Sequence, residues 1–445
     1  MRPATTLATA AAFCLTAAFC RAQDAGEAGA DGFVPLFNGK DLSGWVNVNC
    51  APSTWSVKDG MIHCTGVPTG ALRTEKQYEN FVLELEWRHL KPGGNAGLFI
   101  WAEPISAPGQ PFLRAIEVQI LDHAYGKSDW FTTHGDVFPI HGSTMKPFAP
   151  NRGSRSFPSE ERSNGSPEWN HYRVTCQDGT LRLAVNGKEV SGGENCVYRK
   201  GYLALESEGG QVDYRNIRIK ELPSTDPKPE EVAPEDEGFK PLYTGVDLSG
   251  WKHGPAHEGH WKASDWRLSY DGKAEGDDPH LWSEKSYGDF VLICDWRWTG
   301  KPVKSQQPIV LPDGSEKADA EGNPVTEEID DAGDSGIYLR GNSKSQVNIW
   351  CWGCGSGEVY GYRKDAAMSP EVRAGVTPKL KADNPIGQWN RFIITMKGDR
   401  LTVVLNGKTV IENAQLPGVP AEGPIALQHH GAPIEFAGIY VKELK

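Results

Sequence analysis

The feature that most restricts the fold of this chain is an internal duplication. Residues 32–45 return as residues 238–251 with ten of the fourteen positions identical, and both segments end in Asp-Leu-Ser-Gly-Trp. Further matching pairs follow in the same order: 81–88 with 290–297, 169–174 with 389–394, 181–188 with 401–408, and 217–222 with 439–444. A repeat of this length predicts two copies of one domain, which we place at residues 32–222 and 238–445.

Residues 223–237 separate the two copies. Proline and acidic residues dominate this segment. Such a composition favours extended conformations and buries little apolar surface. We therefore predict an extended, poorly packed linker.

Each copy is predicted to be an all-β sandwich of two sheets. Asn186-Gly187 and Asn406-Gly407 each lie between two alternating apolar runs. Asn-Gly is the strongest short hairpin signal, because both residues tolerate positive φ. Short strands recur with turn residues between them, and the 50 glycine and 31 proline residues suit many turns.

The alternation along the strands predicts which side chains line a binding face, because successive side chains of a strand point to opposite faces. The apolar sets are assigned to the core: Leu98, Ile100, Ile116, Val118 and Ile120, and in the second copy Ile337, Leu339, Val347 and Ile349. The opposite face mixes aromatic, amide and charged groups, as a surface that binds a polar ring would. Extended to neighbouring strands, it presents Glu86, Arg88, Trp101, Glu117, Gln119 and Glu206, and in the second copy Asp295, Arg297, Tyr338, Arg340, Asn348, Trp350, Gln428 and His430.

Structural alternatives exist for several of these groups. Glu86 with Arg88, and Asp295 with Arg297, also suit solvated ion pairs. Trp101 and Trp350 are either platforms for the apolar face of a sugar or packing under loops, and His430 is also consistent with a surface histidine.

The start of the chain is predicted to direct export. Arg2 precedes a small, apolar stretch, and Cys20-Arg21-Ala22 resembles a cleavage site, so residues 1–22 are typical of a signal peptide. A lipid anchor at Cys20 is the alternative. No later segment is apolar enough to span a membrane. The formal net charge of -12 disfavours nucleic acid as a partner.

Seven cysteines follow the predicted cleavage site. Export permits disulfides. Cys50 with Cys64, and Cys176 with Cys196, are candidate pairs, and Cys351 with Cys354 is a candidate short bridge.

The repeated motifs resemble those of the 3-keto-disaccharide hydrolase domain family. The resemblance rests on the Phe-x-Pro-Leu opening with Asp-Leu-Ser-Gly-Trp, the strand 81–88, Glu117-Val-Gln119, the Trp-Asn turns and the segment 427–431. It implies two tandem concanavalin-A-like jelly-roll β-sandwiches. It also implies a saccharide substrate with a keto group at C3, and a partner oxidoreductase that makes this keto sugar.

Two kinds of chemistry fit the predicted face. Ordinary glycosidases need two carboxyl groups, which Glu86, Glu117 or Glu206 could supply. The chemistry implied by the resemblance needs one base and donors to an oxyanion. Glu117 or His430 suits the base, and Arg340 with Asn348 suits the oxyanion.

Two loops carry further candidates. His134 and Asp136, in the long segment 123–166 of the first copy, are either catalytic or order that loop. Asp330, Asp331 and Asp334 form either a solvated acidic turn or a site for a divalent metal such as calcium. No other cofactor is indicated.

The sequence thus predicts an exported hydrolase that cleaves glycosidic bonds in 3-keto-glycosides or related sugars. A tandem carbohydrate-binding protein without catalysis is the alternative. The differences between the copies also allow one catalytic copy and one that delivers substrate.

Overall fold

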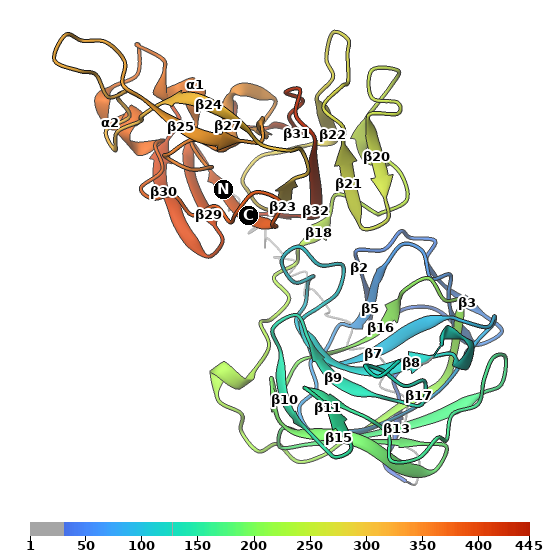
Figure 1. Cartoon of the computed structure of the whole chain (residues 1–445). Helices are drawn as coiled ribbons and strands as arrows, with labels where there is room; N and C mark the ends of the chain where they lie inside the picture. Colours follow the sequence, from blue (N-terminus) through green and yellow to red (C-terminus); the bar gives the residue numbers. More distant parts are fainter. Residues whose placement is uncertain (1–30, 127) are drawn as a thin grey trace, which may run out of the picture.

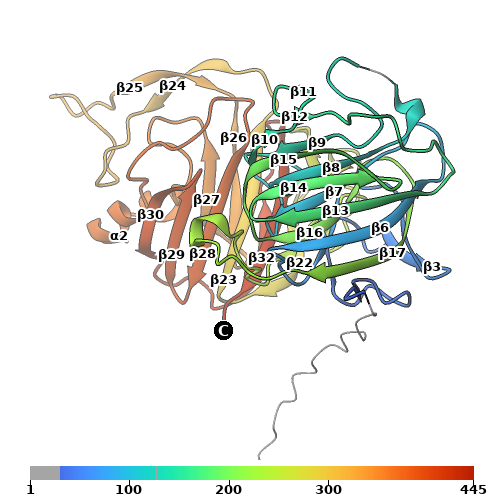
Figure 2. The ribbon, with the colours of Figure 1, turned by 90° about the horizontal axis from the view of Figure 1, so that it is seen from below.

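The computed structural model describes residues 31–126 and 128–445, and nearly all of its regular structure is β-strand (Figure 1). Two bodies of stacked sheets lie beside each other, as Figures 1 and 2 both show. The predicted leader, residues 1–22, lies outside the described residues. None of the described helices combines the length and the apolar character that crossing a membrane requires.

The described residues of the first body form two antiparallel sheets. The first, called here the β6 sheet, has the order β10 (Thr144–Pro147), β15 (Lys188–Val197), β14 (Thr180–Val185), β13 (Asn170–Gln177), β6 (Phe81–His89), β17 (Val212–Glu221), β4 (Met61–Cys64) and β3 (Trp55–Lys58), with β1 (Val34–Pro35) beside β17. The second, the β8 sheet, has the order β11 (Asn151–Arg152), β12 (Arg155–Ser156), β9 (Val137–Ile140), β8 (Ala115–Leu121), β7 (Asn95–Ala102), β16 (Tyr202–Ser207), β5 (Gly70–Thr74) and β2 (Trp45–Val48).

The second body repeats this order. Its β23 sheet runs β20 (Trp261–Ser264), β21 (Arg267–Tyr270), β32 (Ile434–Glu443), β23 (Phe290–Trp298), β28 (Asn390–Lys397), β29 (Arg400–Leu405) and β30 (Lys408–Gln415), with β18 (Lys240–Pro241) beside β32. Its β27 sheet runs β19 (Trp251–Lys252), β22 (Leu281–Tyr287), β31 (Gly423–Leu427), β26 (Asp334–Leu339) and β27 (Asn342–Trp350). A separate hairpin pairs β24 (Val303–Pro308) with β25 (Thr326–Asp331). The short helices are α1 (Tyr360–Arg363) and α2 (Pro370–Gly375), with 3-10 turns at His123–Tyr125 and Pro229–Glu231. The fold is two tandem jelly-roll β-sandwiches.

The core of each sandwich confirms the predicted apolar faces. Every residue of the two predicted apolar sets is buried in the cluster between the sheets of its own domain. The predicted Asn-Gly hairpins are also confirmed. Asn186 and Gly187 have φ of 47° and 88° between β14 and β15, and Asn406 and Gly407 have 50° and 76° between β29 and β30.

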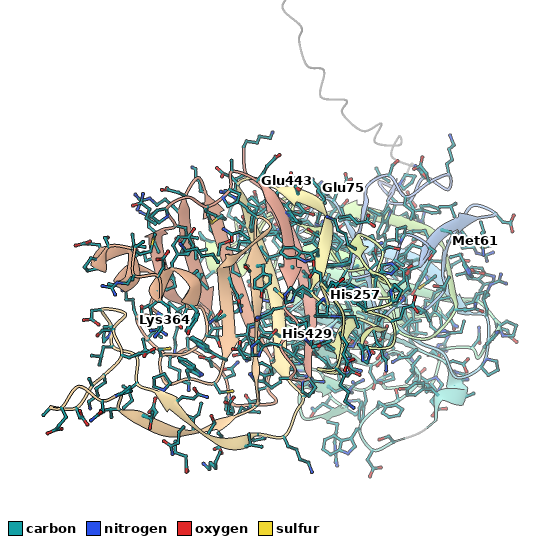
Figure 3. The ribbon with its side chains drawn as sticks, turned by 90° about the horizontal axis from the view of Figure 1, so that it is seen from above. Met61, Glu75, His257, Lys364, His429 and Glu443 are labelled. Atoms are coloured by element: carbon teal, nitrogen blue, oxygen red, sulfur yellow. The ribbon has the colours of Figure 1, made fainter. Side chains whose placement is uncertain are left out.

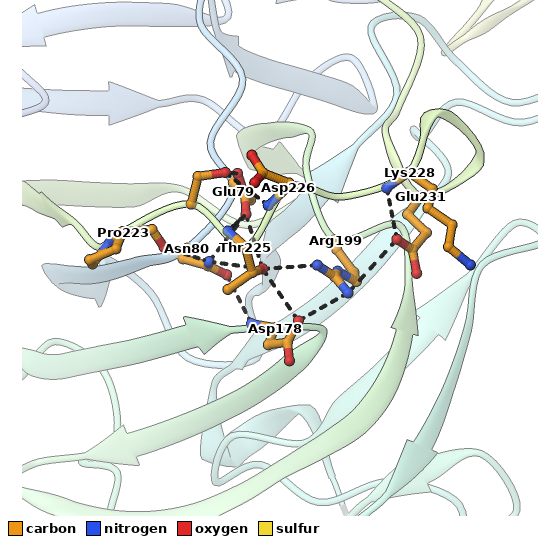
Figure 4. Close-up of polar contacts among 10 residues, drawn as sticks. Glu79, Asn80, Asp178, Arg199, Pro223, Thr225, Asp226, Lys228 and Glu231 are labelled. Carbon is orange, nitrogen blue, oxygen red and sulfur yellow. Dashed lines mark hydrogen bonds and ion pairs between the residues drawn. The ribbon is translucent and has the colours of Figure 1, made fainter.

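Residues 223–237 contain no named strand and are mostly exposed, as the prediction of an extended linker expects, but polar contacts tie the segment to the first sandwich. Thr225 N donates to Glu79 Oε1 over 2.7 Å, and the Pro223 carbonyl accepts from Asn80 Nδ2 over 2.8 Å. Arg199 lies 3.7 Å from Glu231, as Figure 4 shows among the contacts of this segment. The segment both donates to and accepts from polar groups of the first sandwich, and these contacts hold it in place although it buries little apolar surface.

The predicted disulfides are not formed. All seven cysteines among the described residues are free thiols, and most of them are buried. Cys64, Cys176 and Cys196 lie in the core of the first sandwich. Burial raises the pKa of the Cys64 thiol to about 11, which keeps it protonated and unreactive.

Candidate functional site

Two glutamates meet on the outer face of the β8 sheet because a glycine lies between them. Glu117 is on β8 and Glu206 is on β16, and β7 runs between these strands. A Cβ atom placed on Gly97 of β7 would lie 2.8 Å from Glu206 Oε2 and 3.0 Å from Glu117 Oε1. The missing side chain at Gly97 therefore leaves the space in which both carboxyl groups lie.

A third glutamate and two amides extend this group. Asn95 Nδ2 donates to Glu208 Oε2. Gln119 Nε2 donates to Asn95 Oδ1 over 2.8 Å. The chain of contacts from Glu208 through Asn95 to Gln119 fixes the orientation of both amides.

Arg155 supplies a positive charge from the loop strand β12. Its Nη1 lies 3.1 Å from Asp136 Oδ2 and 3.5 Å from Gln119 Oε1. Its guanidinium carbon lies 3.3 Å from the centre of the Phe138 ring. Asp136, whose Oδ2 also accepts from Thr132 N over 2.9 Å, holds Arg155 beside the carboxyl groups.

These groups line a pocket of about 310 Å³. Its polar floor contains the three glutamates, Asn95, Gln119 and Arg155. Aromatic rings form its wall: Phe112, Tyr125, Phe131, Phe138 and His141. A polar floor with an aromatic wall suits a small polar ring.

Burial raises the pKa values of all three glutamates, and repulsion from a neighbouring glutamate adds to the rise for Glu117 and Glu206. For Glu117 burial is the main cause, the charge of Glu208 adds to it, and Arg155 opposes it, so its pKa rises to about 8. Burial and then Glu117 raise the pKa of Glu206 well above its ordinary value. Burial raises that of Glu208 to about 7, against the hydrogen bond from Asn95. At neutral pH the pocket therefore holds protonated acids beside a carboxyl group close to its titration point.

Stability is expected to fall as pH rises above the ordinary glutamate value. Glu206 keeps its proton in the folded state but loses it above pH 4.5 in the unfolded chain. The folded state thus binds more protons, and the free energy of unfolding decreases by up to about 1.4 kcal/mol for each pH unit. Urea unfolding at steps from pH 5 to about pH 8 checks this, with Glu206→Gln expected to flatten the slope. Glu189→Gln, at an exposed position, should leave the slope unchanged; equal slopes in all three proteins would contradict the prediction.

Four residues that were predicted on the binding face lie in the opposite sheet of their sandwich. The prediction that these four residues face a ligand is therefore wrong. Glu86 and Arg88 are on β6, where they bind Arg215 and Asp213. Asp295 and Arg297 are on β23, where they bind Arg391 and Glu435. These strands belong to the opposite sheet of each sandwich, because alternation gives the side of a strand but not its sheet.

Trp101 and Arg340 occupy equivalent positions and depart from the predicted face for the same reason. Both have left-handed φ, 53° and 52°, which turns their side chains inward. Trp101 Nε1 donates to the Glu79 carbonyl over 2.9 Å, and Arg340 Nε donates to the Gly288 carbonyl over 2.8 Å. Both residues are fully buried, so neither can contact substrate as predicted.

A loop covers two more of the predicted residues. Gly357 N donates to the Asn348 carbonyl over 2.8 Å, so residues 355–359 lie along β27. Trp350 stacks on Trp352 at 4.1 Å, and its Nε1 donates to the Gly355 carbonyl. Asn348 and Trp350 are therefore buried, and the prediction that they face a ligand is wrong.

The second sandwich carries amides where the first carries acids. Strand register places Gln346 at the position of Glu117 and Gln428 at that of Glu206. Gln346 Nε2 donates to Gln428 Oε1 over 2.5 Å beside Gly336, the equivalent of Gly97. His430, at the position of Glu208, lies 4.0 Å from Asp334.

Aromatic rings border this second site. The Tyr338 ring lies 5.6 Å from that of Trp282 and 4.9 Å from that of His280. The backbone N–H of His429 donates to His280 Nδ1 over 3.1 Å, and Figure 3 shows His429 toward the middle of the molecule. The second site thus presents aromatic rings and amide groups, and few carboxyl groups.

The predicted metal site is not supported by the geometry. Asp330 binds Lys304 over 3.0 Å, and Asp331 accepts from Gly333 N over 3.0 Å. Asp334 instead faces His430, and its pKa rises to about 6, mainly through burial. Across residues 31–126 and 128–445 there is no group of three or more acidic, histidine or cysteine side chains that could hold a metal ion.

His134 lies outside the pocket. Its Nδ1 is 2.9 Å from Ser163 Oγ, and its ring centre is 4.6 Å from that of His123. Its partner in the prediction, Asp136, contacts Arg155 as described above. These contacts order the loop, so His134 has the structural role rather than the catalytic one of the two that the sequence allowed.

Sequence reasoning missed several residues of the pocket. Glu208 lies two residues after Glu206 and shares its face, so alternation alone could have added it. Asn95 begins a strand whose pattern is interrupted by Gly97, and Arg155 lies in a loop. No sequence periodicity could have placed Arg155.

Fold and pocket together define a class: a tandem pair of concanavalin-A-like β-sandwiches whose first member carries clustered carboxyl groups. The chain belongs to the family described as the 3-keto-alpha-glucoside-1,2-lyase-like domain, whose sequence model matches residues 32–220 and 238–442.

Individual relatives cover one sandwich or little more. A 3-keto-disaccharide hydrolase of Bacteroides thetaiotaomicron is 24% identical over 252 residues, which are 43% of this chain and 79% of that protein. The structure of a candidate glycosyl hydrolase from Parabacteroides distasonis is 24% identical with a TM-score of 0.35, covering 44% of this chain and 95% of its own. A carbohydrate-binding module from Bacillus subtilis is 12% identical with a TM-score of 0.28, covering 40% of this chain and 95% of its own.

Proposed function

We propose that the first sandwich cleaves the glycosidic bond of 3-keto-glycosides by elimination followed by addition of water. The observation that carries this proposal is the meeting of Glu117, Glu206 and Glu208 in one pocket, with their pKa values raised toward and above neutrality. The family match and the hydrolase relative support the same substrate class.

The reaction uses the acidity of a carbon next to a ketone. A base takes the proton from C2, and its electron pair forms an enolate with the C3 oxygen. When the C3 carbonyl forms again, the C1–C2 double bond appears, the C1–O bond breaks and the leaving oxygen takes a proton from an acid. Water then adds to C1 and a proton returns to C2, so the net change is hydrolysis.

The protonation state and surroundings of each pocket residue indicate which step of the reaction it performs. Glu117 is the base, because the Arg155 charge favours its ionised form over that of Glu206. Glu208, which ionises more readily, is engaged by Asn95 Nδ2. Glu206, which keeps its proton, is the acid for the leaving oxygen. Arg155 stabilises the enolate oxygen, as a preorganised donor in a buried site does effectively. Asp136 positions Arg155, and Glu208 with Asn95 binds the sugar hydroxyls.

Solvent isotope labelling tests the proposed route directly. The full chain is incubated in D₂O with a 3-keto-disaccharide and, in parallel, with the unoxidised disaccharide. Elimination and rehydration should release the aglycone only from the keto sugar and place one deuterium at C2. Cleavage of the keto sugar without deuterium at C2 would contradict elimination, and cleavage of the plain disaccharide would favour a two-carboxylate hydrolase.

We assign the second sandwich a binding role without cleavage. The replacement of Glu117 and Glu206 by Gln346 and Gln428 removes the base and the acid but keeps groups that hydrogen-bond to hydroxyls. The rings of Tyr338 and Trp282 suit the apolar face of a sugar. A partner oxidoreductase that supplies the keto sugar, and export through residues 1–22, stay predictions from the sequence.

A further inference from the structure

One loop of the first sandwich lies between the pocket and the second sandwich. Residues 103–114 connect β7 to β8, and Phe112 of this loop lines the pocket. The Phe112 ring lies 5.7 Å from that of Phe99 and stacks on His141 at 6.1 Å. The position of this loop therefore decides the shape of the pocket wall.

A buried ion pair of the second sandwich holds the backbone of this loop. Arg391 binds Asp295 through Nε over 2.6 Å and through Nη2 over 2.8 Å. Gly109 N donates to Asp295 Oδ2 over 2.8 Å, and Arg391 Nη2 donates to the Ser106 carbonyl over 3.0 Å. The Asp295 side chain is 0% exposed, so this contact is sealed from water.

A tyrosine of β32 adds a second contact. The Tyr440 hydroxyl donates to Asn49 Oδ1 over 2.7 Å and lies 3.1 Å from Ser106 Oγ. Asn49 Nδ2 in turn donates to the Pro111 carbonyl over 3.3 Å, next to Phe112. The Ser106 end of the loop segment is thus bound to the second sandwich directly, and the Pro111 end is bound to it through Asn49 of the first sandwich.

The two copies are complementary in this contact. The equivalents of Asp295 and Arg391 in the first sandwich are Glu86 and His171, which line an open hollow of about 870 Å³. The equivalent of the loop in the second sandwich is a short turn between β26 and β27. In the described part of the chain, the first sandwich therefore has the long loop but no equivalent ion pair, and the second sandwich has the ion pair but no equivalent loop.

We propose that the second sandwich positions the pocket wall of the first, with Asp295, Arg391 and Tyr440 as positioning residues that act through residues 106–112. The expected effect of these residues on turnover rests on the proposed function of the pocket. The contact itself, and its effect on the loop, do not depend on what the pocket binds.

Gly109→Ala in the full chain tests the proposal. Gly109 has φ +66, and a Cβ atom there would lie 2.3 Å from Trp389 Cγ, so the added methyl pushes the loop away from the second sandwich. Gly187→Ala is the matched control, because Gly187 has φ +88 and open space around it. Gly109→Ala is expected to raise KM for the 3-keto-disaccharide roughly tenfold, with a smaller change in kcat and a thermal midpoint equal to the control's. KM and kcat equal to those of the control would overturn the proposal.

Hydrogen exchange separates this proposal from the proposed function. In the wild-type chain the amides of residues 106–112 should be protected, and in Gly109→Ala and Tyr440→Phe they should exchange faster while β8 and β23 stay protected. Unchanged exchange of the loop in both variants would overturn the positioning role, whether or not the protein turns over a 3-keto sugar. Absence of turnover with the expected exchange pattern would instead count against the proposed function alone.

Discussion

Replacing Glu117 with glutamine is expected to lower kcat/KM on a 3-keto-disaccharide by roughly a thousandfold, the range in which a general base contributes. The variant reproduces Gln346 of the second sandwich at the equivalent position. It keeps the shape of the side chain and removes the only function that the proposal assigns to it. Steady-state release of the aglycone measures the effect.

The pH dependence gives the same prediction a second test. Because burial raises the pKa of Glu117 to about 8, wild-type activity should increase as pH rises toward that value and the base ionises. Glu189→Gln, on an exposed site of β15, controls for loss of a surface carboxylate and should keep full activity. Unchanged turnover in Glu117→Gln would exclude Glu117 as the base, and Glu208→Gln would then be the next variant to measure.

Replacing Arg340 with alanine is expected to destabilise the second sandwich by about 3 kcal/mol or more, because each buried carbonyl left without its donor costs roughly 1–3 kcal/mol. Arg340 donates to the carbonyls of Gly288 and Pro420 over 2.8 and 3.0 Å. It also donates to Asp289 Oδ1 over 2.8 Å. Alanine would leave these acceptors, and the Gly398 carbonyl that accepts from Arg340 Nη1 over 2.6 Å, without their donor, and it would create a cavity.

Thermal and urea unfolding measure this loss, and Arg340→Lys provides the comparison. Lysine keeps the charge but cannot reach the acceptors in the fixed geometry of a guanidinium, so it should recover only part of the stability. A catalytic Arg340 would give the opposite pattern, with turnover lost and the unfolding midpoint unchanged. That result would contradict the structural role.

The alternation of side chains predicted the core and half of the polar floor of the pocket, namely Glu117, Gln119 and Glu206. It assigned Leu98 and Val118 to the interior and Glu117 and Gln119 to the other face, and their burial agrees. It failed for Glu86 because the pattern along one strand does not say to which sheet that strand belongs. It failed for Trp101 because one residue with left-handed φ inverts the side on which the chain places its side chain.

Other parts of the site depend on contacts that no local pattern encodes. Arg155 reaches the pocket through its ion pair with Asp136 and the ring of Phe138. The loop that carries Phe112 is held by residues 186 to 334 positions away in the sequence. Such long-range contacts follow from the packing of the two sandwiches, which the duplication alone does not determine.

The glycine beneath the carboxyl groups is present in both sandwiches, as Gly97 and Gly336. The second copy therefore has the same space at its pocket floor, with amides at the positions of the acids. A glutamine codon becomes a glutamate codon by a single base change. Two base changes would therefore place a second pair of carboxyl groups on the backbone of the second sandwich, at the positions of Gln346 and Gln428.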